Sequence, residues 1–242
     1  MRLAYDFHMH SCLSPCGSDD MTPYNLVNMA KICGLKIIAL TDHNSTGNCR
    51  AAIQAGKDAG VAVIPGMELN TAEEIHVICL FPDIDAADAF GAKIKENLPP
   101  IKNKPDIFGL QLYMDARDKI LGAEENLLVM ASFITIDEAP GLVRSFGGFC
   151  YPAHVDRQSF SITASFGIFP PELGFTCAEI TPAGDETSAK QKYPELEKLR
   201  IIRSSDSHYL ESMGEALDII DLADCTAQSA VSYFQSLKAA AD

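Results

Sequence analysis

Hydrophobic positions along the chain alternate between two patterns. Short apolar runs, typical of buried strands, are separated by stretches in which apolar residues recur every three or four positions, as on one face of a helix. The runs predict strands at residues 3–9, 36–40, 61–64, 75–81, 149–153, 177–180 and 199–203. The helical stretches are residues 22–33, 46–59, 87–98, 136–146 and 227–234. Repeated strand–helix units predict an α/β fold with a parallel sheet, either open or closed into a barrel.

One stretch interrupts this alternation. Residues 99–135 begin with Pro99-Pro100, and residues 111–114 and 119–121 flank an Asp-Ala-Arg-Asp turn that predicts a hairpin. We interpret residues 99–135 as an insertion in a single domain that spans residues 1–242. Residues 216–242 are expected to form a C-terminal strand and helix extension.

Composition places the chain among folded globular proteins. It has 242 residues, of which 47% are hydrophobic and 21% charged, and its 33 acidic and 19 basic residues give a net charge of −14. That charge disfavours duplex nucleic acid and favours a small phosphorylated partner. It leaves the oligomeric state open. The N-terminus lacks a secretory signal pattern and no apolar run is long enough to span a membrane, so we expect a cytoplasmic protein without a membrane partner.

All six histidines lie at the end of a predicted strand, just beyond one, or within one. They are His8, His10, His43, His76, His154 and His208. Two acidic residues share this placement. Glu68 follows the strand at 61–64, and Asp206 follows the strand at 199–203 and precedes His208 by two positions. In parallel α/β folds the carboxyl ends of the strands meet at one rim, where active sites form. Imidazoles and carboxylates at one rim predict a site for divalent metal ions.

Six sequence blocks resemble the polymerase and histidinol phosphatase (PHP) family of metal-dependent phosphoesterases. They are HMHSCLS, LTDHNS, PGMELN, EIHVICLF, CYPAHVDR and SSDSHY, in that order. The resemblance implies a distorted (β/α)7 barrel of the PHP type, with up to three metals at its C-terminal rim. It implies a first metal held by His8, His10, Glu68 and Asp206. It implies a second on Glu68, His76 and His154, and a third on His43 and His208.

The segment after the HxH pair departs from the simplest family pattern, which supplies one further ligand of the third metal. Asp19 is the ligand we expect here, and Asp20 and Cys16 are alternatives. The two aspartates could instead cap the helix that begins near Pro23. Asp42 either ligates a metal or orients the residues that do.

The chemistry expected of this ligand set is hydrolysis of a phosphate ester. Two or three divalent ions (zinc, manganese or iron) lower the pKa of a bound water and supply hydroxide near neutral pH. We expect Glu68, Asp206 and His208 to act in catalysis and Arg157 to bind the phosphate, unless Arg157 is merely a surface residue. The expected substrate is a small phosphorylated metabolite or a nucleotide.

Three other functions remain as alternatives. The nearest is an exonuclease that acts on short oligonucleotides. An amidohydrolase-type C–N hydrolase also uses an HxH pair and a late aspartate, but it usually needs a mid-chain lysine at a strand end, and none is evident. The third is a metal-binding PHP module without catalytic activity.

Overall fold

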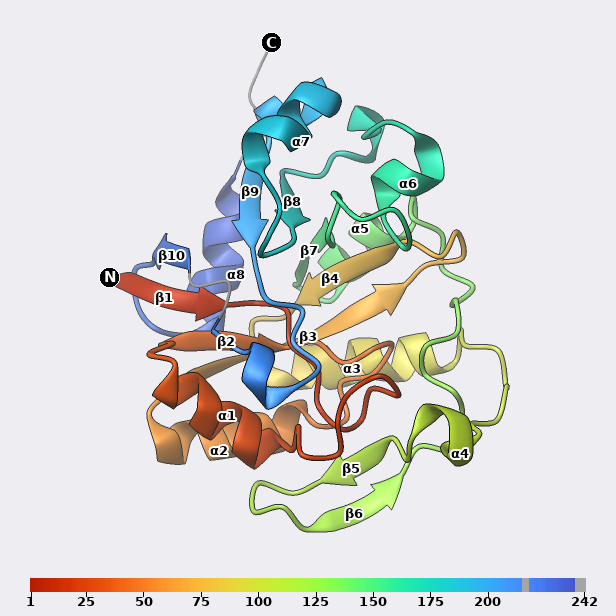
Figure 1. Ribbon diagram of the computed structural model, residues 1–242, viewed down its shortest axis with the longest axis vertical. Coiled ribbons are helices and arrows are strands. Elements are labelled where there is room, and N and C mark those ends of the chain that lie inside the picture. The colour runs from red at the N-terminus through yellow and green to blue at the C-terminus, as the bar shows by residue number, and fades with distance from the viewer. Residues whose placement is uncertain (215–217, 238–242) are drawn as a thin grey trace.

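A curled six-stranded sheet lies at the centre of the structure, a computed structural model that describes residues 1–214 and 218–237 (Figure 1). The strands are β1 (Arg2–Asp6), β2 (Ile37–Leu40), β3 (Ala62–Asn70), β4 (His76–Leu80), β5 (Leu112–Met114), β6 (Ile120–Ala123), β7 (Phe149–Pro152), β8 (Cys177–Ile180), β9 (Arg200–Arg203) and β10 (Asp218–Asp221). The central sheet has the order β10-β1-β2-β3-β4-β7. Two separate pairs, β5–β6 and β8–β9, complete the strands of the described residues.

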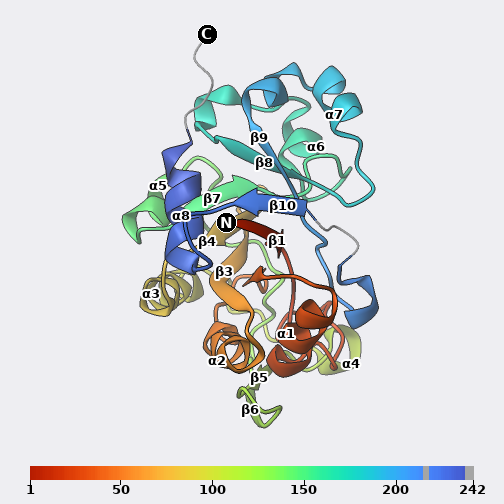
Figure 2. The same ribbon diagram turned by 90° about the vertical axis from the view of Figure 1, so that its left-hand side faces the viewer.

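The helices lie around the curled sheet and beside the two separate strand pairs (Figure 2). They are α1 (Pro23–Ile32), α2 (Cys49–Ala59), α3 (Ile84–Lys95), α4 (Pro105–Phe108), α5 (Ala139–Ser145), α6 (Ile162–Phe166), α7 (Glu186–Lys192) and α8 (Ala227–Ser236). The predicted α/β class is therefore confirmed. None of the helices in these two described segments has the length and apolar character needed to cross a membrane.

The direction of the strands differs from the parallel sheet that the alternation suggested. Strands β1, β2 and β3 are parallel, whereas β3–β4, β4–β7 and β1–β10 are antiparallel pairs. Only residues 71–75 separate β3 from β4. A parallel connection needs a crossover of a dozen residues or more, so this short link forces the two strands to run in opposite directions.

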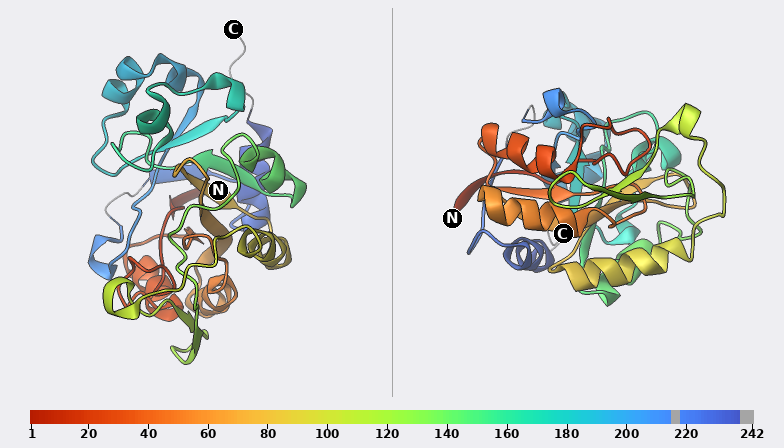
Figure 3. Two further views of the ribbon diagram at one scale, coloured as in Figure 1. Left: turned by 90° about the vertical axis from the view of Figure 1, so that its right-hand side faces the viewer. Right: turned by 90° about the horizontal axis from the view of Figure 1, so that it is seen from below.

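The first helix begins where the sequence predicts it. Thr22 caps α1, with its hydroxyl oxygen accepting a hydrogen bond from the Asn25 amide at 3.1 Å, and Pro23 is the first helical residue. Two predicted helices are shorter than expected, because α2 begins only at Cys49 and α5 covers Ala139–Ser145. The hairpin predicted within residues 99–135 is confirmed as β5–β6, which projects from the rest of the chain (Figure 3).

The C-terminal helix α8 closes one face of the sheet. Ala230, Val231 and Phe234 of α8 are buried in one hydrophobic cluster with Leu3 and Tyr5 of β1. Strand β10 and α8 lie within the predicted C-terminal extension, of which residues 216–217 and 238–242 are outside the described residues. Residues at the two ends of the chain thus pack together behind the strands that carry the histidines.

Candidate metal centre

Each histidine of the candidate site is positioned by the end of a strand or by the loop that follows it. Strand β1 ends at Asp6, and the backbone continues through His8 and His10 with Met9 bridged to Ser207. His8 and His10 face the site, whereas Met9 is buried in a hydrophobic cluster. This alternation of side chains is the one expected of extended backbone.

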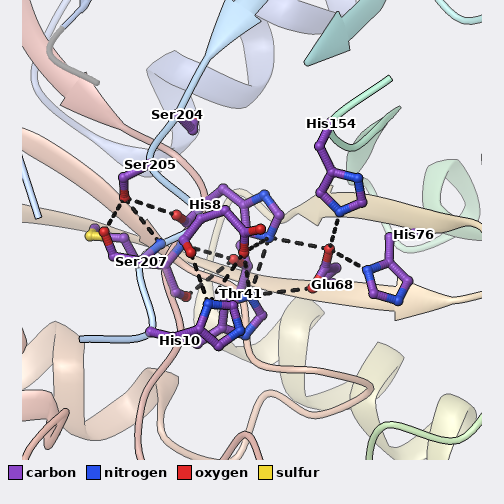
Figure 4. A network of polar contacts seen from close by, with 12 residues as sticks. His8, His10, Thr41, Glu68, His76, His154, Ser204, Ser205 and Ser207 are labelled. Carbon is purple, nitrogen blue, oxygen red and sulfur yellow. Dashed lines mark hydrogen bonds and ion pairs between the residues drawn. The ribbon is translucent and has the colours of Figure 1, made fainter. Parts of the chain in front are cut away.

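Glu68 of β3 lies at the centre of the site. Figure 4 shows its carboxylate between His76 and His154 on one side and His8 and His10 on the other. Its distances to the histidine ring nitrogens are 2.8 Å to His76 Nδ1, 3.0 Å to His43 Nδ1, 3.2 Å to His8 Nε2, 3.2 Å to His10 Nε2 and 3.3 Å to His154 Nε2. Five imidazoles from four segments of the chain therefore converge on one buried carboxylate.

Asp206 adds a second carboxylate to this centre. Its Oδ1 lies 3.2 Å from Nε2 of both His8 and His10, and its Oδ2 lies 2.6 Å from Nη1 of Arg157. His208 turns back on the same loop, with Nδ1 donating to the Asp206 carbonyl oxygen at 2.8 Å. Asp206 and His154 both have positive φ, 53° and 29°, a backbone strain that costs about 1–3 kcal/mol each and is typical of functional sites.

Three overlapping groups of side chains have the geometry to hold a cation. They are His8, His10, Glu68 and Asp206; His43, Glu68 and His76; and His10, His43 and His208. Within each group the ligand atoms lie within 4.8 Å of one another. His154 is next to the second group, because its Nε2 lies 3.3 Å from Glu68.

The arrangement of the donor atoms suits coordination of a cation better than hydrogen bonding among the atoms themselves. Glu68 Oε2, Asp206 Oδ1 and His43 Nδ1 are all buried, and none has a hydrogen bond of regular geometry despite close neighbours. A buried polar atom without such a partner is costly, and a divalent cation bound among these atoms would satisfy them together. The mixture of imidazole nitrogen and carboxylate oxygen suits zinc, manganese or iron.

Neighbouring polar groups orient the ligand histidines. Ser14 Oγ donates its proton to Asp42 at 2.7 Å and lies 3.0 Å from His10 Nδ1, which therefore donates to it. His10 Nε2 is then free to face Glu68 and Asp206. Asp42 also accepts hydrogen bonds from the amide and hydroxyl of Ser11, so its position is that of an orienting residue.

Glu179 of β8 performs the same orienting role for His8, and sequence reasoning missed it. Its Oε1 lies 2.8 Å from His8 Nδ1 and 3.2 Å from the backbone amide of His154. The side chain is buried at 1% exposure. Its only signal in the sequence is an acidic residue inside an otherwise apolar strand.

The electrostatics of the site divide the imidazoles into two groups. Burial lowers the pKa of His10 and His43, but nearby carboxylates, with Glu68 beside both, raise the pKa of each to about 9. Burial dominates at His76 and lowers its pKa to about 4, and at His208 it lowers the pKa to about 3. Glu68 is buried too, yet the surrounding imidazoles hold its pKa well below the usual range.

The segment after the HxH pair does not bring Asp19 or Asp20 into any of the three groups found in the described chain. Both are exposed, and the Asp20 carbonyl accepts a hydrogen bond from the Asn25 side chain in α1. Cys16 lies beside His43, where its thiol contributes to the raised pKa of that imidazole. A role for Asp19 as ligand stays a prediction.

Nucleases are among the known proteins that are similar to this chain in sequence or structure. A 5'-3' exoribonuclease of Haemophilus influenzae is 34% identical over 83 residues, which are 33% of this chain and 29% of that protein. The lesion-specific endonuclease Q of Pyrococcus furiosus has a similar fold, with a TM-score of 0.70, 16% identity and coverage of 97% of this chain and 56% of that one. A complex of endonuclease Q with a 27-mer duplex carrying an abasic lesion at the active site gives a TM-score of 0.72, with 16% identity and coverage of 99% and 58%. The chain thus spans less than a third of the exoribonuclease and over half of endonuclease Q.

The expectation of a small phosphorylated partner, with duplex nucleic acid disfavoured, is wrong. A protein with this fold holds a duplex at its active site, and a sequence relative is an exoribonuclease. The net charge of −14 sums over the whole chain, and several of its carboxylates are the buried groups of the site itself. Bound cations reverse the sign of the potential at that point, which the sum over the chain does not register.

A sequence model of the PHP domain matches residues 6–132, just over half of the chain. That range contains the HxH pair, His43, Glu68 and His76, the residues around which the three groups form. The chain belongs to the PHP domain family.

Proposed function

We propose that this protein is a nuclease that hydrolyses phosphodiester bonds in nucleic acid with two or three divalent cations. The observation that carries the proposal is the position of Glu68, which belongs to two of the three ligand groups at once. Adjacent cations that share one carboxylate can bind both the attacking and the leaving oxygen of a phosphate ester. The name of the exoribonuclease relative supports nucleic acid as the substrate.

We infer the following ligands. His8, His10, Glu68 and Asp206 would hold one cation. Glu68, His76 and His154 would hold a second, with His43 close to Glu68. His10, His43 and His208 would line a third position. When bound, the cations lower the pKa of water and stabilise charge on phosphate oxygens.

Residues of the chain also orient the ligand histidines and bind the substrate. Glu179 and the Ser14–Asp42 pair keep the Nε2 atoms of His8 and His10 directed at the cations. His208 is 21% exposed, so its ring lies at the solvent side of the ligand cluster. Arg157, next to Asp206 and 44% exposed, would bind a non-bridging phosphate oxygen, because guanidinium matches phosphate geometry.

Hydrolysis of labelled oligonucleotides tests the proposal. The protein is supplied with Mn²⁺, Fe²⁺ or Zn²⁺ and given single strands and duplexes labelled at either end, with and without an abasic residue. We expect cation-dependent cleavage that is lost in the His8→Ala/His10→Ala double variant. The position of the labelled products separates cleavage from an end from internal cleavage. Absence of cleavage with all three cations, in protein shown to contain them, contradicts the proposal.

A further inference from the structure

The segment from Asp156 to Ser161 places a guanidinium group and an aromatic ring beside the metal centre. It follows His154 and leads into α6, and it carries Arg157 and Phe160. The Arg157 side chain and Phe160 are each 44% exposed, so both can be reached from solvent. Neither residue belongs to the three ligand groups.

Phe160 lies directly against a candidate ligand. Its ring stacks on the imidazole of His76, with centroids 4.9 Å apart and an angle of 22° between the planes. His76 Nδ1 in turn lies 2.8 Å from Glu68. One face of the Phe160 ring is therefore covered by the metal centre, and the exposed area belongs to the remainder of the residue.

The backbone holds Phe160 in this place at an energetic cost. Its φ is 54°, in the left-handed region that a phenylalanine seldom adopts, and its carbonyl accepts a hydrogen bond from the His76 amide at 3.0 Å. Glycine or asparagine would relieve the strain at this position. A strained, exposed aromatic residue beside a reaction centre indicates that the ring itself has a use there.

The segment is also fixed at other points. The Arg157 amide donates to the His154 carbonyl at 2.9 Å, and the Ser161 hydroxyl donates to the Arg157 carbonyl at 2.7 Å. The same hydroxyl oxygen caps α6 by accepting from the Ala164 amide at 3.2 Å. Arg157 and Phe160 are thus held in a defined arrangement before any ligand binds, which lowers the entropy lost on binding.

We propose that Phe160 is a platform on which an unpaired base of the substrate stacks, while Arg157 binds the neighbouring phosphate. This inference rests on the proposed nuclease function and adds the form of the substrate. A nucleotide presents a planar base and an anionic phosphate, which match an aromatic face and a guanidinium group. Stacking requires the base to be out of the helix, as in a single strand, at a frayed end or in an extruded nucleotide. The Phe160 ring can stack on any of the bases, because each base has a flat aromatic face.

Matched oligonucleotides test the platform. One 12-mer single strand carries a normal base at the cleaved position, and the other carries a tetrahydrofuran abasic residue there. For the unmodified protein we expect KM to be roughly tenfold lower with the base than without it. Phe160→Leu should raise KM for the base-bearing strand to nearly that of the abasic strand, and Phe160→Tyr should keep the difference. Phe166→Leu, at an equally exposed phenylalanine at the end of α6, is the control.

A binding measurement makes the result independent of turnover. Quenching of a 2-aminopurine placed at the same position should be strong in the unmodified protein and in Phe160→Tyr, and weak in Phe160→Leu. If Phe160→Leu instead lowers kcat equally on both strands, or reduces bound Mn²⁺, the ring only shields His76 and the platform is refuted. Equal quenching in all variants also refutes it. Failure of the unmodified protein to cleave either strand contradicts the nuclease function, and the quenching result then decides on the platform alone.

Discussion

Nδ1 of His8 lies 2.8 Å from Oε1 of Glu179, and both residues are almost completely buried. The carboxylate oxygen accepts this hydrogen bond, so Nδ1 of His8 carries a proton and Nε2 is the ring nitrogen that faces the proposed cation. The same Glu179 oxygen accepts from the amide of His154. One carboxylate from β8 therefore orients a residue of each of two proposed ligand sets.

Removal of Glu179 should weaken cation binding. For Glu179→Ala we expect about a 10- to 100-fold higher dissociation constant for Mn²⁺, because His8 loses the partner that sets its orientation. Glu179→Gln should have a smaller effect, since an amide oxygen can still accept from Nδ1. Equilibrium dialysis with metal analysis measures the change. Glu172→Ala, at an exposed position, serves as control, and equal affinities in Glu179→Ala and the control would show that the contact does not matter for binding.

Substitution of Glu68 should abolish both cation occupancy and activity. The neutral amide of Glu68→Gln cannot balance two cations, and its nitrogen cannot ligate them. We expect loss of at least one bound ion per chain and near-complete loss of phosphodiester hydrolysis, measured by elemental analysis and by turnover. Glu74→Gln, in the exposed link after β3, should leave both unchanged. Full occupancy and turnover in Glu68→Gln would mean that the cations bind elsewhere.

Arg157 should affect the substrate and not the cations. We expect Arg157→Ala to raise KM for an oligonucleotide roughly tenfold, because a charge-assisted hydrogen bond to phosphate is lost. Bound Mn²⁺ should stay the same. Steady-state kinetics with parallel metal analysis separate the two effects, and Arg144→Ala, an exposed arginine of α5, controls for loss of a positive charge. A fall in cation content with unchanged KM would assign Arg157 to supporting Asp206 instead.

Cation affinity should rise with pH. In the cation-free protein the pKa values of His10 and His43 are raised to about 9, so at neutral pH these imidazoles are protonated and a cation must displace the protons. Affinity should therefore increase between pH 6.5 and 9, on the order of tenfold per pH unit for each proton displaced, and level off above that range. Calorimetry in buffers of different ionisation enthalpy counts the protons released. Affinity that is constant over this range would show that both imidazoles are already neutral.

Helix α8 should be essential for stability. Phe234 is 1% exposed, and its ring contacts Phe7 and Phe149 at centroid distances of 5.9 and 5.2 Å. Phe234→Ala should lower the free energy of unfolding by about 3–5 kcal/mol, through lost burial and the cavity left behind. Urea unfolding followed by circular dichroism measures it. Gln228→Ala, on the exposed side of the same helix, should change stability by less than about 0.5 kcal/mol. Similar losses in both variants would mean that the helix as a whole is perturbed.

Local sequence determined where most elements lie and which residues carry the chemistry. The apolar run at 177–180 became β8, and the Thr22-Pro23 pair begins α1, because burial pattern and capping depend on neighbours in the chain. The histidines could be identified from the sequence because a hydrophobic core gives no reason for an imidazole at the end of one strand after another. Their repetition there indicates a shared site. Their roles as ligands remain predictions, although the structure brings all six around Glu68 and Asp206.

Tertiary structure alone decided how these pieces meet. Hydrophobic periodicity is the same in parallel and antiparallel strands, and the predicted strand ended at residue 64. The extension of β3 to Asn70, and with it the short link at residues 71–75 that reverses the chain into β4, is seen only in the structure. Glu179 is 171 positions from His8, and Phe160 is 84 positions from His76, so no local pattern could pair them. Net charge likewise does not say where the charges lie, whereas recognition of a phosphate depends on the electrostatic potential at the site that binds it. Contacts between distant residues exist only once the chain has folded, and in this protein they orient His8 and place Phe160 against His76.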